Sequence, residues 1–118
     1  MHDDTQSLVL PDLFGPDADL DKLDWLPFKE GIEIYRIYGD GREGASAALL
    51  RYQPGASVPL HTHPDYELVL VLRQGQSDSK GGYSAGTLVL NMPGSQHEIC
   101  SPAGCVVLII WNKPVVFI

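Results

Sequence analysis

Two histidines and a glutamate stand close together in the middle of the chain, in the run HTHPDYE at residues 61–67. Residues i and i+2 of an extended strand share a face, so His61 and His63 can aim their imidazoles at one point. Pro64-Asp65 is typical of a tight turn, which can bring Glu67 back beside the histidine pair. Neutral imidazoles and a carboxylate are common ligands of divalent transition metals. The run therefore predicts three ligands of a metal site.

A fourth ligand is expected from another part of the chain, and His97 in the run PGSQH (93–97) is the candidate outside the N-terminus. A single histidine on a strand is more often a solvated or hydrogen-bonded residue than a ligand. Two glycine-containing blocks that each end in histidine favour the metal site here. We predict that His61, His63, Glu67 and His97 bind one divalent ion, either Zn, Fe, Mn, Ni or Cu, because mixed nitrogen and oxygen ligands do not select among them. No catalytic acid, base or nucleophile can be named.

The chain has the composition of one small globular domain, with 118 residues, 44% hydrophobic and 19% charged. Its net charge of −7 argues against nucleic acid and against anionic membranes, since both attract basic surfaces. The first residues lack the basic and apolar regions of a signal peptide, and the longest apolar stretch, 106–111, is too short to cross a bilayer. We therefore expect a cytoplasmic protein that binds neither nucleic acid nor membrane.

Short apolar or alternating segments, separated by glycine and proline turns, fill the sequence from Trp25 onward. Residues 66–73 and 77–80 are expected to form separate strands joined by a turn at Gln74-Gly75, and residues 8–10 a short edge strand. This all-β pattern is typical of a sandwich or small barrel. We predict a partly irregular lead segment over residues 1–24 and a single β-barrel domain over residues 25–118.

The two histidine blocks resemble the motifs of the cupin superfamily, G-x5-H-x-H-x3,4-E-x6-G and G-x5-P-x-G-x2-H-x3-N. The first motif matches from Gly55 to Glu67 and the second from Gly86 to His97, with all four ligand positions kept. This resemblance implies an RmlC-like jelly-roll barrel, also described as a double-stranded β-helix, with a metal ion inside. Three positions depart from the patterns: Gly75, which comes one residue late, and Met92 and Ser101, which replace Pro and Asn.

Residues 25–112 are similar in more detail to the ChrR-like cupins, the metal-binding C-terminal domains of ChrR-type anti-sigma factors and their free-standing relatives. The segments that carry this similarity are RYQPGASVPLH (51–61), SDSKGGY (77–83), SAGT (84–87) and PGSQH (93–97). The anti-sigma factors grip their sigma factor with an N-terminal zinc-binding helical module. The first 24 residues here contain no Cys and a single His, so the resemblance implies a stand-alone cupin that does not bind a sigma factor in that way.

Three functions fit such a site. An enzyme, such as a metal-dependent dioxygenase, would transform a small organic molecule. A ChrR-like metal or redox sensor would bind a ligand and regulate a partner without turnover. A structural metal would only stabilise the barrel. The sequence does not decide among them, because the cupin fold carries many functions.

Several other residues could contribute to such a site. Arg51 and Arg73 could hold a substrate carboxylate, although solvated arginines at strand ends are commoner. Cys100 and Cys105 are expected to be free thiols in a reducing compartment, and a redox role for them is left open. We also predict a homodimer, because several strands are apolar on both faces and the two tryptophans, Trp25 and Trp111, are expected near edges.

Overall fold

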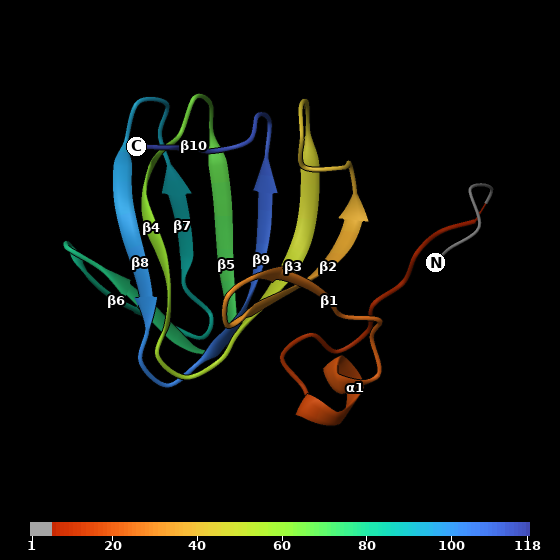
Figure 1. Ribbon diagram of the computed structural model, residues 1–118. Coiled ribbons are helices and arrows are strands. Elements are labelled where there is room, and N and C mark those ends of the chain that lie inside the picture. The colour runs from red at the N-terminus through yellow and green to blue at the C-terminus, as the bar shows by residue number, and fades with distance from the viewer. Residues whose placement is uncertain (1–5) are drawn as a thin grey trace.

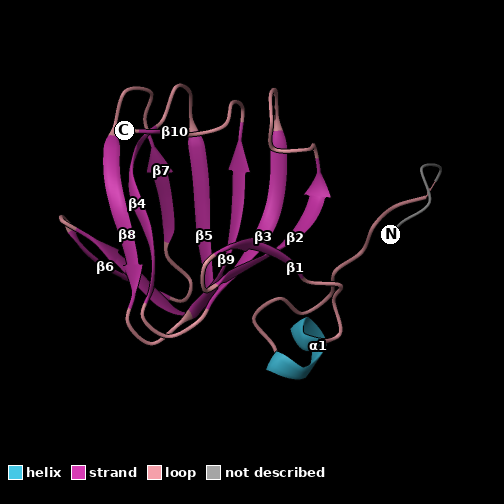
Figure 2. Ribbon diagram, in the orientation of Figure 1, coloured by secondary structure: helices cyan, strands magenta, loops and turns pink. Residues whose placement is uncertain are grey.

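The protein is almost entirely β-structure, as the computed structural model in Figures 1 and 2 shows for residues 6–118, the part of the chain it describes. One short helix and ten strands follow one another: α1 (Asp17–Asp21), β1 (Leu26–Lys29), β2 (Ile32–Tyr38), β3 (Ser46–Tyr52), β4 (Ala56–Thr62), β5 (Glu67–Asp78), β6 (Gly81–Ser84), β7 (Leu88–Asn91), β8 (Gln96–Ser101), β9 (Cys105–Trp111) and β10 (Val116–Phe117). Within the described residues, no helix is both long and apolar enough to span a membrane.

The strands form one curled antiparallel sheet in the order β1-β2-β3-β9-β5-β8-β4-β10, and β6 and β7 pair with β5. The far ends of this order come to the same side of the barrel, where β1 and β10 cross in front of the other strands (Figure 1). The sequence-based prediction of an all-β jelly-roll barrel is therefore confirmed. Segments from both ends of the barrel domain thus lie beside the strands that carry the histidines.

Strand β5 is a single twelve-residue strand that bends from one half of the sheet to the other, so the expected turn at Gln74-Gly75 is wrong. Gln74 has a positive φ of 54°, and the pairing with β9 shifts register just before it. A Cβ at Gly75 would lie 2.7 Å from the carbonyl oxygen of Tyr83 on the paired strand β6, so only glycine fits there. The hydroxyl of Ser101 donates to the Gly75 carbonyl over 2.7 Å. Gly75 and Ser101, two of the positions that depart from the cupin motifs, therefore contact each other at this bend.

Alternating residues of the strands fill the inside of the barrel. Leu50 of β3 lies opposite Val107 of β9, which in turn lies opposite Val71 of β5, and all three are buried. The same alternation turns Glu67 and Trp111 inward at one end of these strands. The inward-facing residues of these strands thus form a closely packed apolar core, and a few polar side chains lie among them.

From Leu10 onward, the lead segment packs on the outside of the barrel, against the face of the sheet that points away from the core. Leu20 of α1 is buried in a second apolar cluster with Leu49, Leu72 and Val106. Arg73 donates two hydrogen bonds to the carbonyl oxygens of Leu13 and Gly15. Residues 8–10 form no strand, contrary to the sequence-based expectation, because side chains rather than a strand ladder hold this segment.

Candidate metal centre

Neighbouring strands bring three imidazoles together inside the barrel. His61 of β4 lies directly opposite His97 of β8 in the strand register. His63 follows β4, and backbone hydrogen bonds hold it to the 93–95 loop: its amide donates to the Ser95 carbonyl (3.0 Å) and its carbonyl accepts from the Gly94 amide (2.8 Å). One ring nitrogen from each histidine lies within 4.8 Å of those of the other two. The two sequence blocks therefore meet as the cupin motifs imply.

The Nδ1 atom of each of these imidazoles lies within hydrogen-bond distance of an oxygen acceptor. His61 Nδ1 donates to the Pro59 carbonyl (2.8 Å), and His63 Nδ1 to the Ser95 carbonyl (3.1 Å) and hydroxyl (2.9 Å). The Ser95 hydroxyl gives its own hydrogen to the Met92 carbonyl, so its oxygen accepts. Because these partners require hydrogen on Nδ1, the neutral ring carries its lone pair on Nε2.

The Nδ1 atom of His97 also faces an oxygen acceptor, which here belongs to a carboxylate instead of a carbonyl. Its Nδ1 lies 3.3 Å from Oδ2 of Asp78, and the other oxygen of Asp78 accepts from the Tyr83 hydroxyl (3.0 Å) and the Lys80 amide (2.9 Å). Burial acts to raise the pKa of Asp78, but the hydrogen bonds from Lys80, Tyr83 and His97 together outweigh it and lower that pKa. An ionised Asp78 thus fixes the ring of His97, a common arrangement behind metal-binding histidines.

Glu67 begins β5 at the edge of the histidine cluster and is buried. Its Oε1 lies 3.3 Å from Nε2 of His63 and accepts a hydrogen bond from Nδ2 of Asn91 (3.1 Å). The Nε2 of His63 has no hydrogen-bond partner, although it is completely buried. A buried nitrogen lone pair beside a carboxylate, with no donor to satisfy it, fits a bound cation.

Burial keeps His61 and His97 in the protonation state that a metal requires. Desolvation lowers the pKa of His61, and it lowers the pKa of His97 as well, with a further contribution from the neighbouring His61. Both imidazoles are therefore neutral at neutral pH, with nitrogen lone pairs available to a cation.

A cavity of about 260 Å³ opens beside the cluster and is lined by His61, Glu67 and His97. Most of its wall is apolar, formed by residues such as Val58 and Ile109. Lys29 and Phe117 also line this cavity: the Phe117 ring of β10 lies 5.7 Å from the His61 ring, and Lys29 Nζ of β1 lies 4.3 Å from the Phe117 ring. The two crossing strands thus contribute side chains to the cavity wall.

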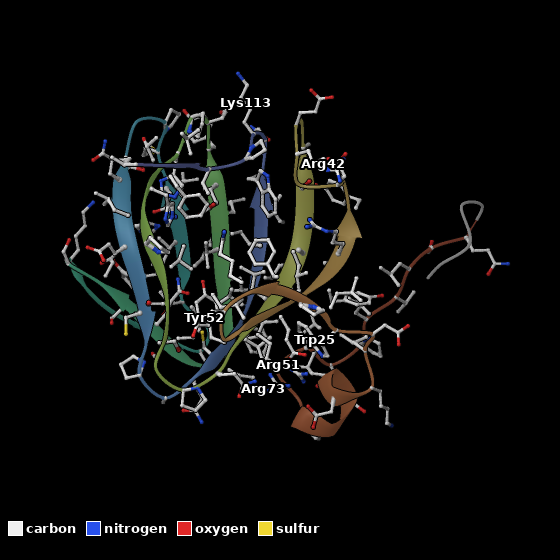
Figure 3. All side chains as sticks on the ribbon, viewed as in Figure 1. Trp25, Arg42, Arg51, Tyr52, Arg73 and Lys113 are labelled. Atoms are coloured by element: carbon white, nitrogen blue, oxygen red, sulfur yellow. The ribbon has the colours of Figure 1, made fainter. Side chains whose placement is uncertain are left out.

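The two arginines that the sequence suggested for substrate binding lie outside this cavity. Figure 3 shows Arg51 and Arg73 beside Trp25 and α1, at the outer side of the barrel. Arg51 pairs with Glu33 (2.9 Å) and Asp21 (3.0 Å) and stacks 4.4 Å from the Trp25 ring centre. Both arginines therefore hold the lead segment in place.

The cysteines are free thiols in the structure, as expected, with Cys100 exposed and Cys105 buried in the core cluster. Burial raises the pKa of the Cys105 thiol, so that little thiolate forms at neutral pH. The redox role that the sequence left open for the two cysteines gains no support from Cys105.

Sequence reasoning missed two residues of this region, Asp78 and Arg36. Asp78 lies in the SDSKGGY segment, but nothing in the sequence connects it to His97. Arg36 lines the cavity, and the pattern Ile32-x-Ile34-x-Arg36 does contain the signal, because alternation turns it to the face of two core isoleucines.

Comparison with known proteins agrees with the fold. The family model described as the ChrR Cupin-like domain matches residues 17–115 of the sequence. The fold and its cluster define a cupin, and the chain belongs to the ChrR cupin-like family. No curated protein matches the chain.

Solved structures place the chain among varied cupins. A chain of the Rhodobacter sphaeroides SigE complex with the anti-sigma ChrR is 25% identical, with a TM-score of 0.69 over 79% of this chain and 50% of that one. This chain thus spans about half of that relative. The acetylacetone dioxygenase from Acinetobacter johnsonii is 15% identical, with a TM-score of 0.76 over 100% of this chain and 80% of that one. At this identity the second likeness shows the fold alone.

Proposed function

We propose that this protein is a metal-dependent cupin that binds and transforms a small organic molecule, with His61, His63, His97 and Glu67 as the metal ligands. The observation that carries the proposal is the shared orientation of the three imidazoles. Each Nδ1 is held by an oxygen acceptor, so each ring offers Nε2 to one buried place.

These residues fit a transition metal in type and in number. Three imidazoles and one carboxylate would leave one or two positions open on a five- or six-coordinate ion, and an open position distinguishes a reactive site from a closed structural one. When bound, such a metal would supply Lewis acidity and, if it is redox-active, dioxygen chemistry. The ligand set suits Zn, Fe, Mn, Ni or Cu.

Other residues of the chain would shield the site from water and orient the metal ligands. The apolar cavity wall excludes water and strengthens electrostatic interactions within the site. Asp78 and Ser95 keep the rings of His97 and His63 in one orientation. The Asn91 amide restrains Glu67, so the carboxylate is directed before any ligand arrives.

Dioxygenase-like chemistry is the reaction we favour, because the donor set faces an apolar cavity large enough for a small organic substrate. The acetylacetone dioxygenase from Acinetobacter johnsonii, which shares the fold at 15% identity, is an example of such a reaction carried out on this fold. A sensor without turnover is the second candidate, and membership of the ChrR cupin-like family favours it. We expect a small-molecule ligand in both cases.

Metal loading followed by dioxygen uptake separates these candidates. Metal-free protein is loaded in turn with Fe(II), Mn(II), Ni(II), Cu(II) and Zn(II), and oxygen consumption is followed with acetylacetone and related diketones. Uptake that requires both metal and organic substrate supports the enzyme, whereas tight zinc binding with no uptake under any metal supports the sensor.

Glu67→Gln and Glu98→Gln form a matched pair for the same assay. Glu98 is exposed on β8, next to His97 in sequence. Metal affinity should fall in the Glu67 variant and stay at the wild-type value in the Glu98 variant. Equal affinities in the two variants would remove Glu67 from the ligand set.

A further inference from the structure

We propose that the cavity binds a small organic anion, about one ring in size, whose carboxylate is held by Arg36. The inference deepens the proposed function, since the same cavity contains the metal ligands, but it rests on different residues. Arg36 stands on β2, whereas the histidines and Glu67 stand on or beside β4, β5 and β8.

Arg36 belongs to the inner face of the barrel at the end of the sheet that carries Trp111. Its register partner is Ala48, which pairs in turn with Ile109 of β9. The small side chain of Ala48 leaves space over the sheet, and both Arg36 and Ile109 line the cavity. A Cβ at Gly41 would lie 2.6 Å from Nη1 of Arg36, so the absence of a side chain at Gly41 makes room for the guanidinium.

The guanidinium of Arg36 has no hydrogen-bond or ion-pair partner among the side chains that the structure describes, although an arginine is charged at every accessible pH. Arg51 contrasts with it, because two carboxylates pair with that side chain. In a chain with a net charge of −7, a half-buried arginine with no carboxylate partner is unusual. Lys29 adds a second positive charge to the cavity wall, whereas Glu67, at the histidine end, is the carboxylate that lines it. The cavity is therefore locally attractive to an anion.

Two unpartnered polar atoms in the same cavity point independently to a ligand. Trp111 Nε1 is a buried donor without an acceptor, and Gln76 Oε1 is a buried acceptor without a donor. Both residues line the cavity, and they are 9% and 6% exposed. Leaving such buried groups unpaired is unfavourable, so a ligand that carries an acceptor and a donor would satisfy both.

The size and lining of the cavity limit the rest of the ligand. An apolar cavity of about 150 Å³ in another protein accommodates benzene, and this cavity measures about 260 Å³. A single ring or a short alkyl chain with a carboxylate therefore fills it. Val69 and Ile109 would contact the apolar body. The carboxylate would take the Arg36 end, and the opposite end of the ligand would face the histidines.

Matched charged and neutral probes test the proposal by calorimetry. Phenylacetate is compared with phenylacetamide, and hexanoate with hexanamide, on metal-free and zinc-loaded protein. We expect at least one carboxylate to bind about tenfold or more tightly than its amide, because a bidentate, charge-assisted contact is lost in the neutral probe. Arg36→Gln should reduce this ratio to about one, whereas Arg42→Gln, at an exposed arginine of the same hairpin, should leave it unchanged.

The results that would overturn the anion-binding proposal differ from the results that would overturn the proposed metal-dependent function. Retention of the full ratio in Arg36→Gln, a ratio near one in the wild type, or no binding of either pair at millimolar concentration overturns the proposal. Arg36→Lys should keep part of the ratio, and the wild-type ratio still decides if Arg36→Gln fails to fold. Zinc stoichiometry should be unchanged in Arg36→Gln. A chain that binds no metal but shows the Arg36-dependent ratio would refute the proposed function and leave this inference standing.

Discussion

Asp78 lies directly behind His97, with its Oδ2 atom 3.3 Å from the Nδ1 atom of the imidazole. The carboxylate is 5% exposed in its side chain and comes from the end of β5, whereas His97 comes from β8. The pair fixes the tautomer and the direction of His97 before any cation binds.

Removal of the Asp78 charge should therefore weaken metal binding without removing a ligand. We expect Asp78→Asn to lower zinc affinity by about 10- to 100-fold at unchanged stoichiometry, measured by competition with a chelator. Asp24→Asn, at an exposed aspartate of the lead segment, serves as the matched control and should bind as the wild type does. Equal affinities in the two variants would show that Asp78 does not position His97.

The barrel core should be sensitive to loss of two methyl groups at Val71, which is 0% exposed at the centre of β5. Val71→Ala should lower the free energy of unfolding by about 2–3 kcal/mol, because buried apolar surface is lost and a small cavity remains. Val9→Ala makes the same change at a residue that is 71% exposed and should have little effect. Urea unfolding curves compare the two variants, and similar midpoints would contradict the described core.

The prediction of a homodimer rests on the strands that are apolar on both faces and no longer on the two tryptophans. Trp25 donates to the Leu20 carbonyl and Trp111 lines the cavity, so neither provides a free apolar edge. Instead, Leu68, Leu88 and Leu90 are exposed on the outer face of β5 and the edge strand β7, where Leu68 lies opposite Leu90. A contiguous exposed leucine surface of this kind favours association with a second copy.

We expect light scattering to give about twice the chain mass of 12.9 kDa at micromolar concentration. The double variant Leu88→Glu/Leu90→Glu should be monomeric, because charges in an apolar interface are not solvated. Val9→Glu, an exposed position on the lead segment, should keep the wild-type mass. A monomeric wild-type protein would rule out the dimer.

The lowered pKa values of His61 and His97 predict an acid-sensitive fold. Burial disfavours the charged imidazoles in the folded chain, whereas unfolded histidines titrate near ~6.5. As the pH falls below about 6.5, the unfolded state therefore binds more protons than the folded state does. The folded state has its full stability above this pH and loses stability as the pH drops toward the lower pKa values of the folded histidines. The Tm of metal-free protein should fall between about pH 7 and 5, and less so in His61→Gln/His97→Gln. A Tm independent of pH in the wild type would contradict the burial of neutral histidines.

Much of the site could be predicted from the sequence because the ligand spacing is local. Alternation in 61–63 and the turn after it determine how His61, His63 and Glu67 approach one another, and one further histidine block supplies His97. Asp78 could not be assigned, since its relation to His97 depends on the curl of the sheet and on the bend in β5. Alternation does turn Arg36 to the inner face, but only the curl of the sheet shows that this face lines the cavity beside the histidines. That bend was itself mistaken for a turn, because a glycine at a strand bend and a glycine in a hairpin look the same in sequence.

The number of metal ions per chain tests the central claim most directly. Protein purified, loaded with zinc and desalted should contain about one ion per chain by elemental analysis. The double variant His61→Ala/His63→Ala should lose most of it, because two of the four ligands are gone, while a His2→Ala control should keep it. Full stoichiometric zinc in the double variant would show that the imidazole cluster is not the metal site.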